Sequence, residues 1–220
     1  MTATKSAYRP PPEPRWPAML ALVAIGGLRL AIPKSLAVGP AWLSIAVVIV
    51  LLIPTVWSRR KDNHNLNQIF GYLITSFITL DMVYSLALLI RALPTHKQAP
   101  GELLRSAAAL WITNVLVFAS WYWRLDAGGP HARELSGAHK DGAFLFPQLT
   151  LLPETRIAMG EEHWSPGFVD YLFLAFNSST AFSPTDTPVL TRWAKMLMMI
   201  QALISFTTVA LLAARAVNIL

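Results

Sequence analysis

Long apolar runs separated by short polar segments dominate the chain, and this pattern predicts helices. Four such runs cover residues 16–32, 41–57, 69–93 and 103–123, and a fifth covers 193–212. A helix of about 20 predominantly apolar residues is long enough to cross the hydrocarbon core of a bilayer. The pattern therefore predicts an all-α membrane protein with five transmembrane helices.

A shorter apolar run precedes the last of these helices. Residues 168–181 give only about four helical turns, which is too short to cross a bilayer comfortably. The run ends in the polar sequence Asn-Ser-Ser-Thr at 177–180, and Pro184 and Pro188 interrupt the segment that follows. Irregular backbone at membrane depth needs shelter from protein or from a water-filled cavity. We therefore expect a re-entrant pore-type half-helix that returns to the side from which it entered.

The composition excludes an ordinary soluble domain. Hydrophobic residues make up 54% of the chain, charged residues only 14%, and the mean hydropathy is +0.46. In soluble proteins about 25% of the residues are charged. The chain contains no cysteine, which excludes disulfides and thiolate metal ligands. The formal net charge of +6 is spread over several loops, so we expect contact with anionic lipid and not with nucleic acid.

These patterns divide the chain into four parts. Residues 1–15 are rich in proline and are predicted to be a disordered tail. Residues 16–123 form a four-helix transmembrane region, and residues 124–166 form a cap on the membrane surface. Residues 167–220 form a unit of half-helix, loop and final helix. We expect the apolar stretch 144–152 of the cap to pack against the helices.

The distribution of basic residues predicts the orientation. With five spans, the amino terminus, the loop Arg59-Arg60-Lys61 and the cap share one side of the membrane, which carries 12 of the 18 Lys and Arg residues. Short loops rich in Lys and Arg stay in the cytoplasm. We therefore expect the amino terminus and the 124–166 loop to be cytoplasmic.

Residues 167–220 resemble the pore helix, filter and inner helix of the potassium-channel pore-loop superfamily. The sequence Ser179-Thr-Ala-Phe-Ser-Pro-Thr185 occupies the place of that family's Thr-Thr-Val-Gly-Tyr-Gly-Asp, and Pro188 matches the proline that usually follows. Phe182 and Pro184 replace the two glycines whose torsions let backbone carbonyls face the ion. The filter is therefore degenerate, and a potassium filter of the familiar shape is not expected.

The same residues are still more similar to a family of uncharacterised bacterial integral membrane proteins. In that family a short helix leads to a Ser/Thr-Asp-Thr triplet, which is Thr185-Asp186-Thr187 in this chain. This resemblance implies an architecture and a bacterial cytoplasmic membrane, and it implies no activity.

Polar side chains around the half-helix are candidates for an ion pathway. A ring of Asp186 carboxylates in an oligomer would concentrate cations, although Asp186 also suits a capped turn. Polar residues at helical spacing on the last helix suit either a pore lining or hydrogen bonds between helices. The candidates are Ser179, Thr180, Phe182, Ser183, Thr185, Asp186, Gln201, Ser205 and Thr208.

Asp81 lies in the middle of the third apolar run, where an ionised side chain costs at least ~2.5–3.5 kcal/mol. We expect it inside the bundle, within reach of a polar group from another span. Arg29 and Arg105 are the nearest basic residues by depth. An ion pair between Asp81 and one of these arginines would either hold the helices together or form part of a proton or cation relay.

No motif for a nucleophile, a phosphate loop or a metal site is present, so we expect no enzyme, cofactor or metal. The cap residues His131, His139, Glu161, Glu162 and His163 lack a recognised ligand spacing. Two functions remain. The first is a weakly selective cation channel formed by a homo-oligomer, with a tetramer favoured and conduction sensitive to Asp186→Asn. The alternative is a non-conducting scaffold or accessory subunit of a larger membrane complex.

Overall fold

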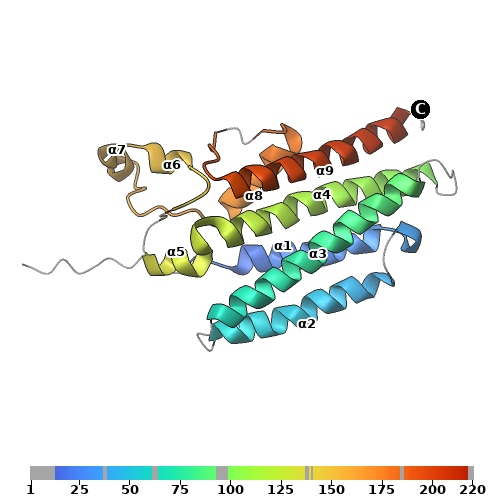
Figure 1. Ribbon diagram of the computed structural model, residues 1–220, viewed down its shortest axis with the longest axis horizontal. Helices are drawn as coiled ribbons and strands as arrows, with labels where there is room; N and C mark the ends of the chain where they lie inside the picture. Colours follow the sequence, from blue (N-terminus) through green and yellow to red (C-terminus); the bar gives the residue numbers. More distant parts are fainter. Residues whose placement is uncertain are drawn as a thin grey trace, which may run out of the picture.

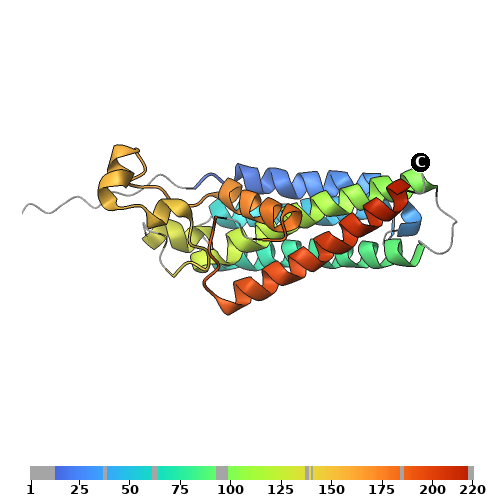
Figure 2. The same cartoon turned by 90° about the horizontal axis from the view of Figure 1, so that it is seen from above.

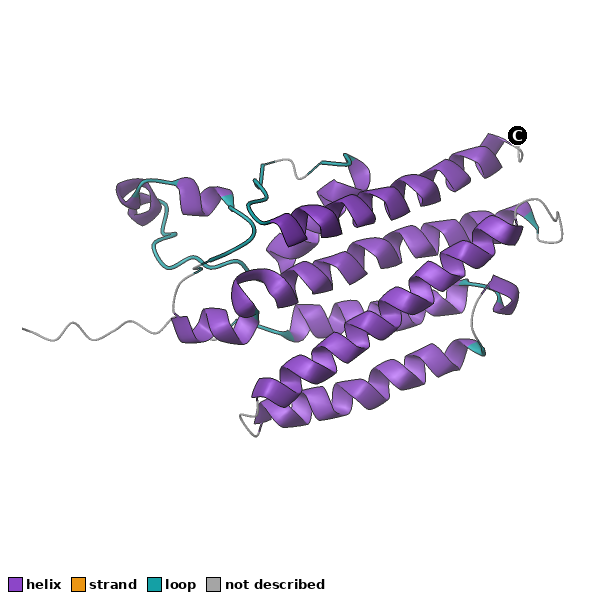
Figure 3. Cartoon of the chain, viewed as in Figure 1, coloured by secondary structure: helices purple, strands orange, loops and turns teal. Residues whose placement is uncertain are grey.

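The computed structural model describes residues 13–36, 39–60, 64–92, 99–136, 139, 141–183 and 186–217. Within these residues the regular structure is helical, apart from one isolated bridge between Phe144 and Val189 (Figure 3). The main helices are α1 (Trp16–Leu28), α2 (Ala41–Arg60), α3 (His64–Ala92), α4 (Pro100–Leu125), α8 (Phe168–Thr180) and α9 (Arg192–Val217). Short helices α5 (Pro130–Ser136), α6 (Pro147–Thr150) and α7 (Pro153–Ala158) form most of the cap, and 3₁₀ turns occur at Arg29–Ala31, Lys34–Leu36 and Asp126–Gly128.

Three segments are long and apolar enough to cross a membrane: Asn65–Ala92, Pro100–Gly128 and Arg192–Ala214. They correspond to α3, α4 and α9, and the prediction of an all-helical membrane protein is confirmed at this level. The apolar parts of the two remaining long segments, Trp16–Ala31 and Trp42–Thr55, are shorter. The five long apolar runs of the sequence are therefore helical over most of their described residues.

Helix α4 is the central element of the bundle (Figure 1). It contacts α1, α3, α8 and α9, while α2 packs against α1 and α3. Small buried residues such as Ser106, Ala107, Ala119 and Ser120 allow neighbouring helices to approach it closely. In the most apolar 18-residue stretch of α4, 67% of the stretch is buried, whereas in the corresponding stretch of α9 only 22% is buried. Most of the α9 surface is therefore left uncovered by the described residues of this chain.

Helix α8 begins at the cap end of the bundle and ends beside the middle of α4 and α9. Its first turn is capped by Asp170, whose Oδ2 accepts a 2.8 Å hydrogen bond from the Gly167 N–H. After α8 the chain returns to the cap, where the Leu145 N–H donates to Pro188 O at 2.9 Å and the Leu190 N–H to Ala143 O at 2.8 Å. In Figure 2, α8 lies along the half of the bundle nearer the cap.

The start of the chain and the cap occupy the same end of the molecule. Arg15 Nη2 lies 2.9 Å from Glu134 Oε2 of α5, and Arg133 Nη2 lies 3.0 Å from Glu13 Oε2. Residues 1–12 of the predicted disordered tail lie outside the described residues. The last part of that tail is ordered, because Glu13 and Arg15 are held by these ion pairs.

Candidate functional site

Asp81 pairs with Arg29 across the bundle, as its place in the middle of an apolar helix predicted. Arg29 Nε lies 3.1 Å from Asp81 Oδ2, and Ser44 Oγ donates a 3.4 Å hydrogen bond to the same oxygen. The Asp81 side chain is 14% exposed and that of Arg29 is 4% exposed. The pair joins α3 to the turn after α1, and Ser44 adds α2. Arg105, the other predicted partner, is exposed near the start of α4 and takes no part in this pair.

Gln201 of α9 is fully buried and connects three helices. Its Nε2 donates hydrogen bonds to Ala175 O at 2.8 Å and to Ser179 Oγ at 2.9 Å, both in α8. Its Oε1 accepts a short hydrogen bond from the Tyr122 hydroxyl of α4. Each polar atom of the Gln201 amide therefore has a partner, as burial in an apolar environment requires.

Further hydrogen bonds extend from Gln201 along α9. Ser205 Oγ donates to Ser179 O at 2.6 Å and accepts from Trp111 Nε1 at 3.0 Å. Asn114 Nδ2 of α4 lies 3.4 Å from Ser179 Oγ and 3.3 Å from Gln201 O. We call this group of neutral side chains the Gln201 cluster; it comprises Trp111, Asn114, Tyr122, Ser179, Gln201 and Ser205. All of them are buried except Trp111, which is half-buried.

The polar face of α9 therefore points into its own protomer. Gln201 and Ser205 bind α8, and the fully buried Thr208 donates to Ile204 O within its own helix at 2.7 Å. Of the two interpretations of this face, a pore lining and hydrogen bonds between helices, these contacts support the second. Ser179, a loop candidate in the sequence, belongs to the same network.

The remaining loop candidates are exposed. Thr180, Phe182, Ser183 and Asp186 lie on the surface of the protomer, and Thr185 lies outside the described residues. Phe182 has a φ of 55°, in the left-handed region that favours glycine. Its ring packs edge-on against Phe206 of α9, with 5.8 Å between ring centroids. The backbone is therefore strained at Phe182, because a side chain is unfavourable at this φ.

An open cavity of about 450 Å³ separates this loop from the first half of α9. Ser178, Phe182 and Ser183 line one side, and Lys195, Met198 and Met199 line the other. The only charged side chain in this lining is the cation Lys195. The described lining therefore offers a cation hydroxyl groups and methionine side chains, but no carboxylate ligand.

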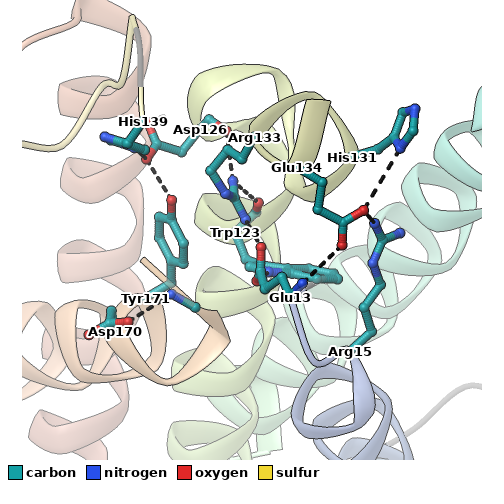
Figure 4. Close-up of polar contacts among 11 residues, drawn as sticks. Glu13, Arg15, Trp123, Asp126, His131, Arg133, Glu134, His139, Asp170 and Tyr171 are labelled. Carbon is teal, nitrogen blue, oxygen red and sulfur yellow. Dashed lines mark hydrogen bonds and ion pairs between the residues drawn. The ribbon is translucent and has the colours of Figure 1, made fainter. Parts of the chain in front are cut away.

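A second buried polar group lies at the cap end of α4 (Figure 4). The Asp126 carboxylate is fully buried and accepts hydrogen bonds from Tyr171 OH at 2.7 Å, from His139 Nε2 at 2.6 Å and from the Ala143 N–H. Burial raises the pKa of the Tyr171 phenol well above its usual value. The hydroxyl therefore keeps its proton and donates a hydrogen bond to the Asp126 carboxylate. These residues join the end of α4, the cap and the first turn of α8; we call them the Asp126 cluster.

An adjoining row of charges connects the start of the chain to α5 (Figure 4). Arg133 is 3% exposed and donates to Trp123 O at 3.0 Å, to Asp126 O at 2.9 Å and to Glu13 Oε2 at 3.0 Å. Glu13 also accepts a hydrogen bond from Trp123 Nε1. The arrangement is a structural clamp, because two buried donors, Arg133 and Trp123, engage the Glu13 carboxylate.

The cap histidines do not form a metal site in the part of the chain that the structure describes, where no group of three metal-binding side chains occurs. His139 faces Asp126, and His131 lies 3.9 Å from Glu134. His163 lies 3.9 Å from its neighbour Glu162 on an exposed part of the cap. Each histidine therefore has a separate carboxylate neighbour.

Asp126 and Tyr171 were not identified as partners from the sequence. The only signal was the position of Asp126, directly after the aromatic run 121–123 and before Gly128-Gly129-Pro130. Its partner Tyr171 is 45 residues further along the chain. A pairing over this separation leaves no local pattern.

Comparisons of the chain with protein-family models, with curated proteins and with solved structures find no match. The function therefore has to be inferred from the geometry described above.

Proposed function

We propose that five segments cross the membrane: α1 with its 3₁₀ extension, α2, α3, α4 and α9. The two shorter apolar stretches support this topology because they pack beside α3 and α4 within the same bundle. In this topology α8 is a re-entrant half-helix, supported by the return of the chain from α8 to the cap. The basic residues of 59–61 and the cap favour a cytoplasmic amino terminus in a bacterial cytoplasmic membrane.

In this topology the protein serves as a non-conducting scaffold or accessory subunit of a membrane complex. The observation that carries this proposal is the engagement of the α9 polar face by α8. Gln201 and Ser205 would have to face water to line a pore, yet their hydrogen-bonding capacity is taken up by Ala175, Ser179 and Tyr122. Freeing them would leave several buried polar groups unpaired, at about 1–3 kcal/mol each.

The outer surface of the same unit fits an interaction with other apolar helices. The face that α8 and α9 leave exposed is almost entirely apolar, and it provides both a lipid contact and a surface for neighbouring subunits. Its main side chains are Phe173, Phe176, Met196, Met199, Leu203 and Phe206.

A weakly selective cation channel is the second candidate. It is favoured by the exposure of Thr180, Ser183 and Asp186, which four copies could direct toward a shared axis. Against it stand the apolar exposed face of α9 and the cation Lys195 in the cavity below the loop.

Ion flux distinguishes the two candidates. The protein is reconstituted into vesicles, and the flux of K⁺, Na⁺ and H⁺ is followed with entrapped fluorescent indicators, with empty vesicles and Asp186→Asn as controls. We expect the wild type, the variant and the empty vesicles to give the same signal. A cation flux that Asp186→Asn reduces would replace the scaffold proposal by the channel.

A further inference from the structure

Arg124, near the end of α4, is a buried cation without a carboxylate partner. The residue is 8% exposed and makes no hydrogen bond or ion pair with the residues that the structure describes. Its guanidinium lies 5.3 Å from the Trp123 ring centroid, which is a weak contact for a buried charge. An ionised side chain removed from water is costly unless an opposite charge or hydrogen-bond acceptors compensate it.

Three described carboxylates at this end of the bundle, those of Glu134, Glu13 and Asp126, are already engaged. Glu134 pairs with Arg15 and also accepts from the Glu13 N–H. Glu13 accepts from Arg133 and Trp123, and Asp126 accepts from Tyr171 and His139. Arg124 therefore lies beside ion pairs that are already formed, and the described residues provide it with no compensating anion.

Two adjoining cavities reach the Arg124 side chain. The larger has a volume of about 160 Å³ and lies between α3, α4 and α5, lined by Arg15, Gln68, Arg124 and His131 among others. The smaller, of about 80 Å³, lies between α1, α2 and α4 and is lined by Ala18, Met19, Leu22 and Leu52. Arg15, Asn67 and Arg124 line both. The larger cavity exceeds by several times the ~30 Å³ that a water molecule occupies in the liquid.

We propose that this cavity binds a phosphate group, with Arg124 and Arg15 as its two cationic ligands. A guanidinium presents paired N–H donors that match phosphate oxygens, and Nε of Arg15 is buried without a hydrogen-bond partner among the described residues. The charged cavity adjoins an apolar one that opens at Met19, which is 37% exposed. This arrangement suits the headgroup of an anionic phospholipid, whose chains would lie along α1, and a free phosphate ester shares the same chemistry.

Gly71 of α3 sets the position of the Arg124 guanidinium. A Cβ at residue 71 would lie 1.8 Å from Arg124 Nη1, so the guanidinium occupies the space that a side chain would take. Gly71→Ala displaces the flexible end of Arg124 while leaving every charge in place. It also improves the helix propensity of α3 by about 1 kcal/mol, which protects the fold.

The test measures the thermal unfolding of the full chain in a neutral detergent. The probes are dihexanoyl phosphatidylglycerol, dihexanoyl phosphatidylcholine and inorganic phosphate, each titrated separately. We expect the anionic lipid to raise the Tm of the wild type and the zwitterionic lipid to have little effect. Arg124→Gln weakens this binding by about tenfold or more, because a charge-assisted contact is lost. Gly71→Ala weakens it in the same direction.

The matched control is Arg105→Gln, which removes an exposed arginine from the other end of the same helix and keeps the lipid effect. Without any probe, Arg124→Gln unfolds at the same or a higher temperature than the wild type, because it removes an uncompensated buried charge. Stabilisation by inorganic phosphate that equals that of the lipid and depends on Arg124 would assign the cavity to a soluble phosphate. Equal lipid effects in wild type and Arg124→Gln would overturn the proposal.

Discussion

The Gln201 cluster lies at the middle of α4 and α9 and contains only neutral groups, whereas the Asp126 cluster lies at the cap end and includes charged ones. Apart from the half-buried Trp111, the side chains of both clusters are buried. In the Gln201 cluster, amide and hydroxyl groups bond to one another, apart from Asn114 Oδ1, which has no partner among the described residues. No charge is brought into the apolar interior, which is the less costly arrangement. At the cap end a carboxylate is supported by several donors. The two clusters fix the two ends of α8, one by specific neutral bonds and the other by a buried charge.

The largest effect on stability is expected from the charged cluster. Asp126→Ala removes the acceptor of three hydrogen bonds and leaves Tyr171 and His139 without their partner. We expect the free energy of unfolding to fall by about 3–5 kcal/mol, the usual cost of breaking a buried charged network. Titration with a denaturing detergent measures it. Glu154→Ala, which removes an exposed carboxylate of the same cap, should change the value by no more than about 0.5 kcal/mol.

A smaller effect is expected from the neutral cluster. Gln201→Leu keeps the volume of the side chain and leaves Tyr122 OH and Ser179 Oγ with fewer partners. The expected loss is about 1–3 kcal/mol, because hydrogen bonds between membrane helices average only ~0.6 kcal/mol but several are lost together. Thr207→Val on the exposed face of α9 is the control. A loss as large as that of Asp126→Ala would remove the distinction between the two clusters.

The smallest effect concerns the loop beyond the neutral end of α8. Phe182 is held at a φ of 55°, and glycine adopts this conformation without strain. We expect Phe182→Gly to be more stable than Phe182→Ala by about 0.5–1 kcal/mol, since both lose the contact with Phe206 and only glycine relieves the backbone. Comparison of the two unfolding midpoints checks this. Equal midpoints would show that the loop is not strained at this residue.

The sequence predicted the helices well and the roles of their polar residues only in part. Apolar runs and their interruptions are local signals, and they located the helices, including α8, to within a few residues. Asp81 was predicted to need a partner because the free-energy cost of an ionised side chain in a membrane depends on its depth, and its depth follows from its place in the apolar run. The choice between a pore lining and helix contacts at Gln201 depended on whether Ser179 lay opposite it, and helical spacing does not contain that information. The same limit applies to Asp126, whose donors come from two other segments, the cap (His139 and Ala143) and α8 (Tyr171).

The central claim is that α8 keeps the polar face of α9 dry within one protomer. The chain lacks cysteine, so single cysteines can be introduced by Ser205→Cys in the buried face and by Ser183→Cys in the exposed loop. Thr207→Cys provides a site on the outer side of the same helix, where the proposed topology places lipid. Reaction of each variant with a charged, membrane-impermeant thiol reagent in open membrane fragments measures contact with water. The account predicts modification at residue 183 and none at residue 205 or 207. Rapid modification at residue 205 would show that water reaches the α9 polar face, and it would contradict the account.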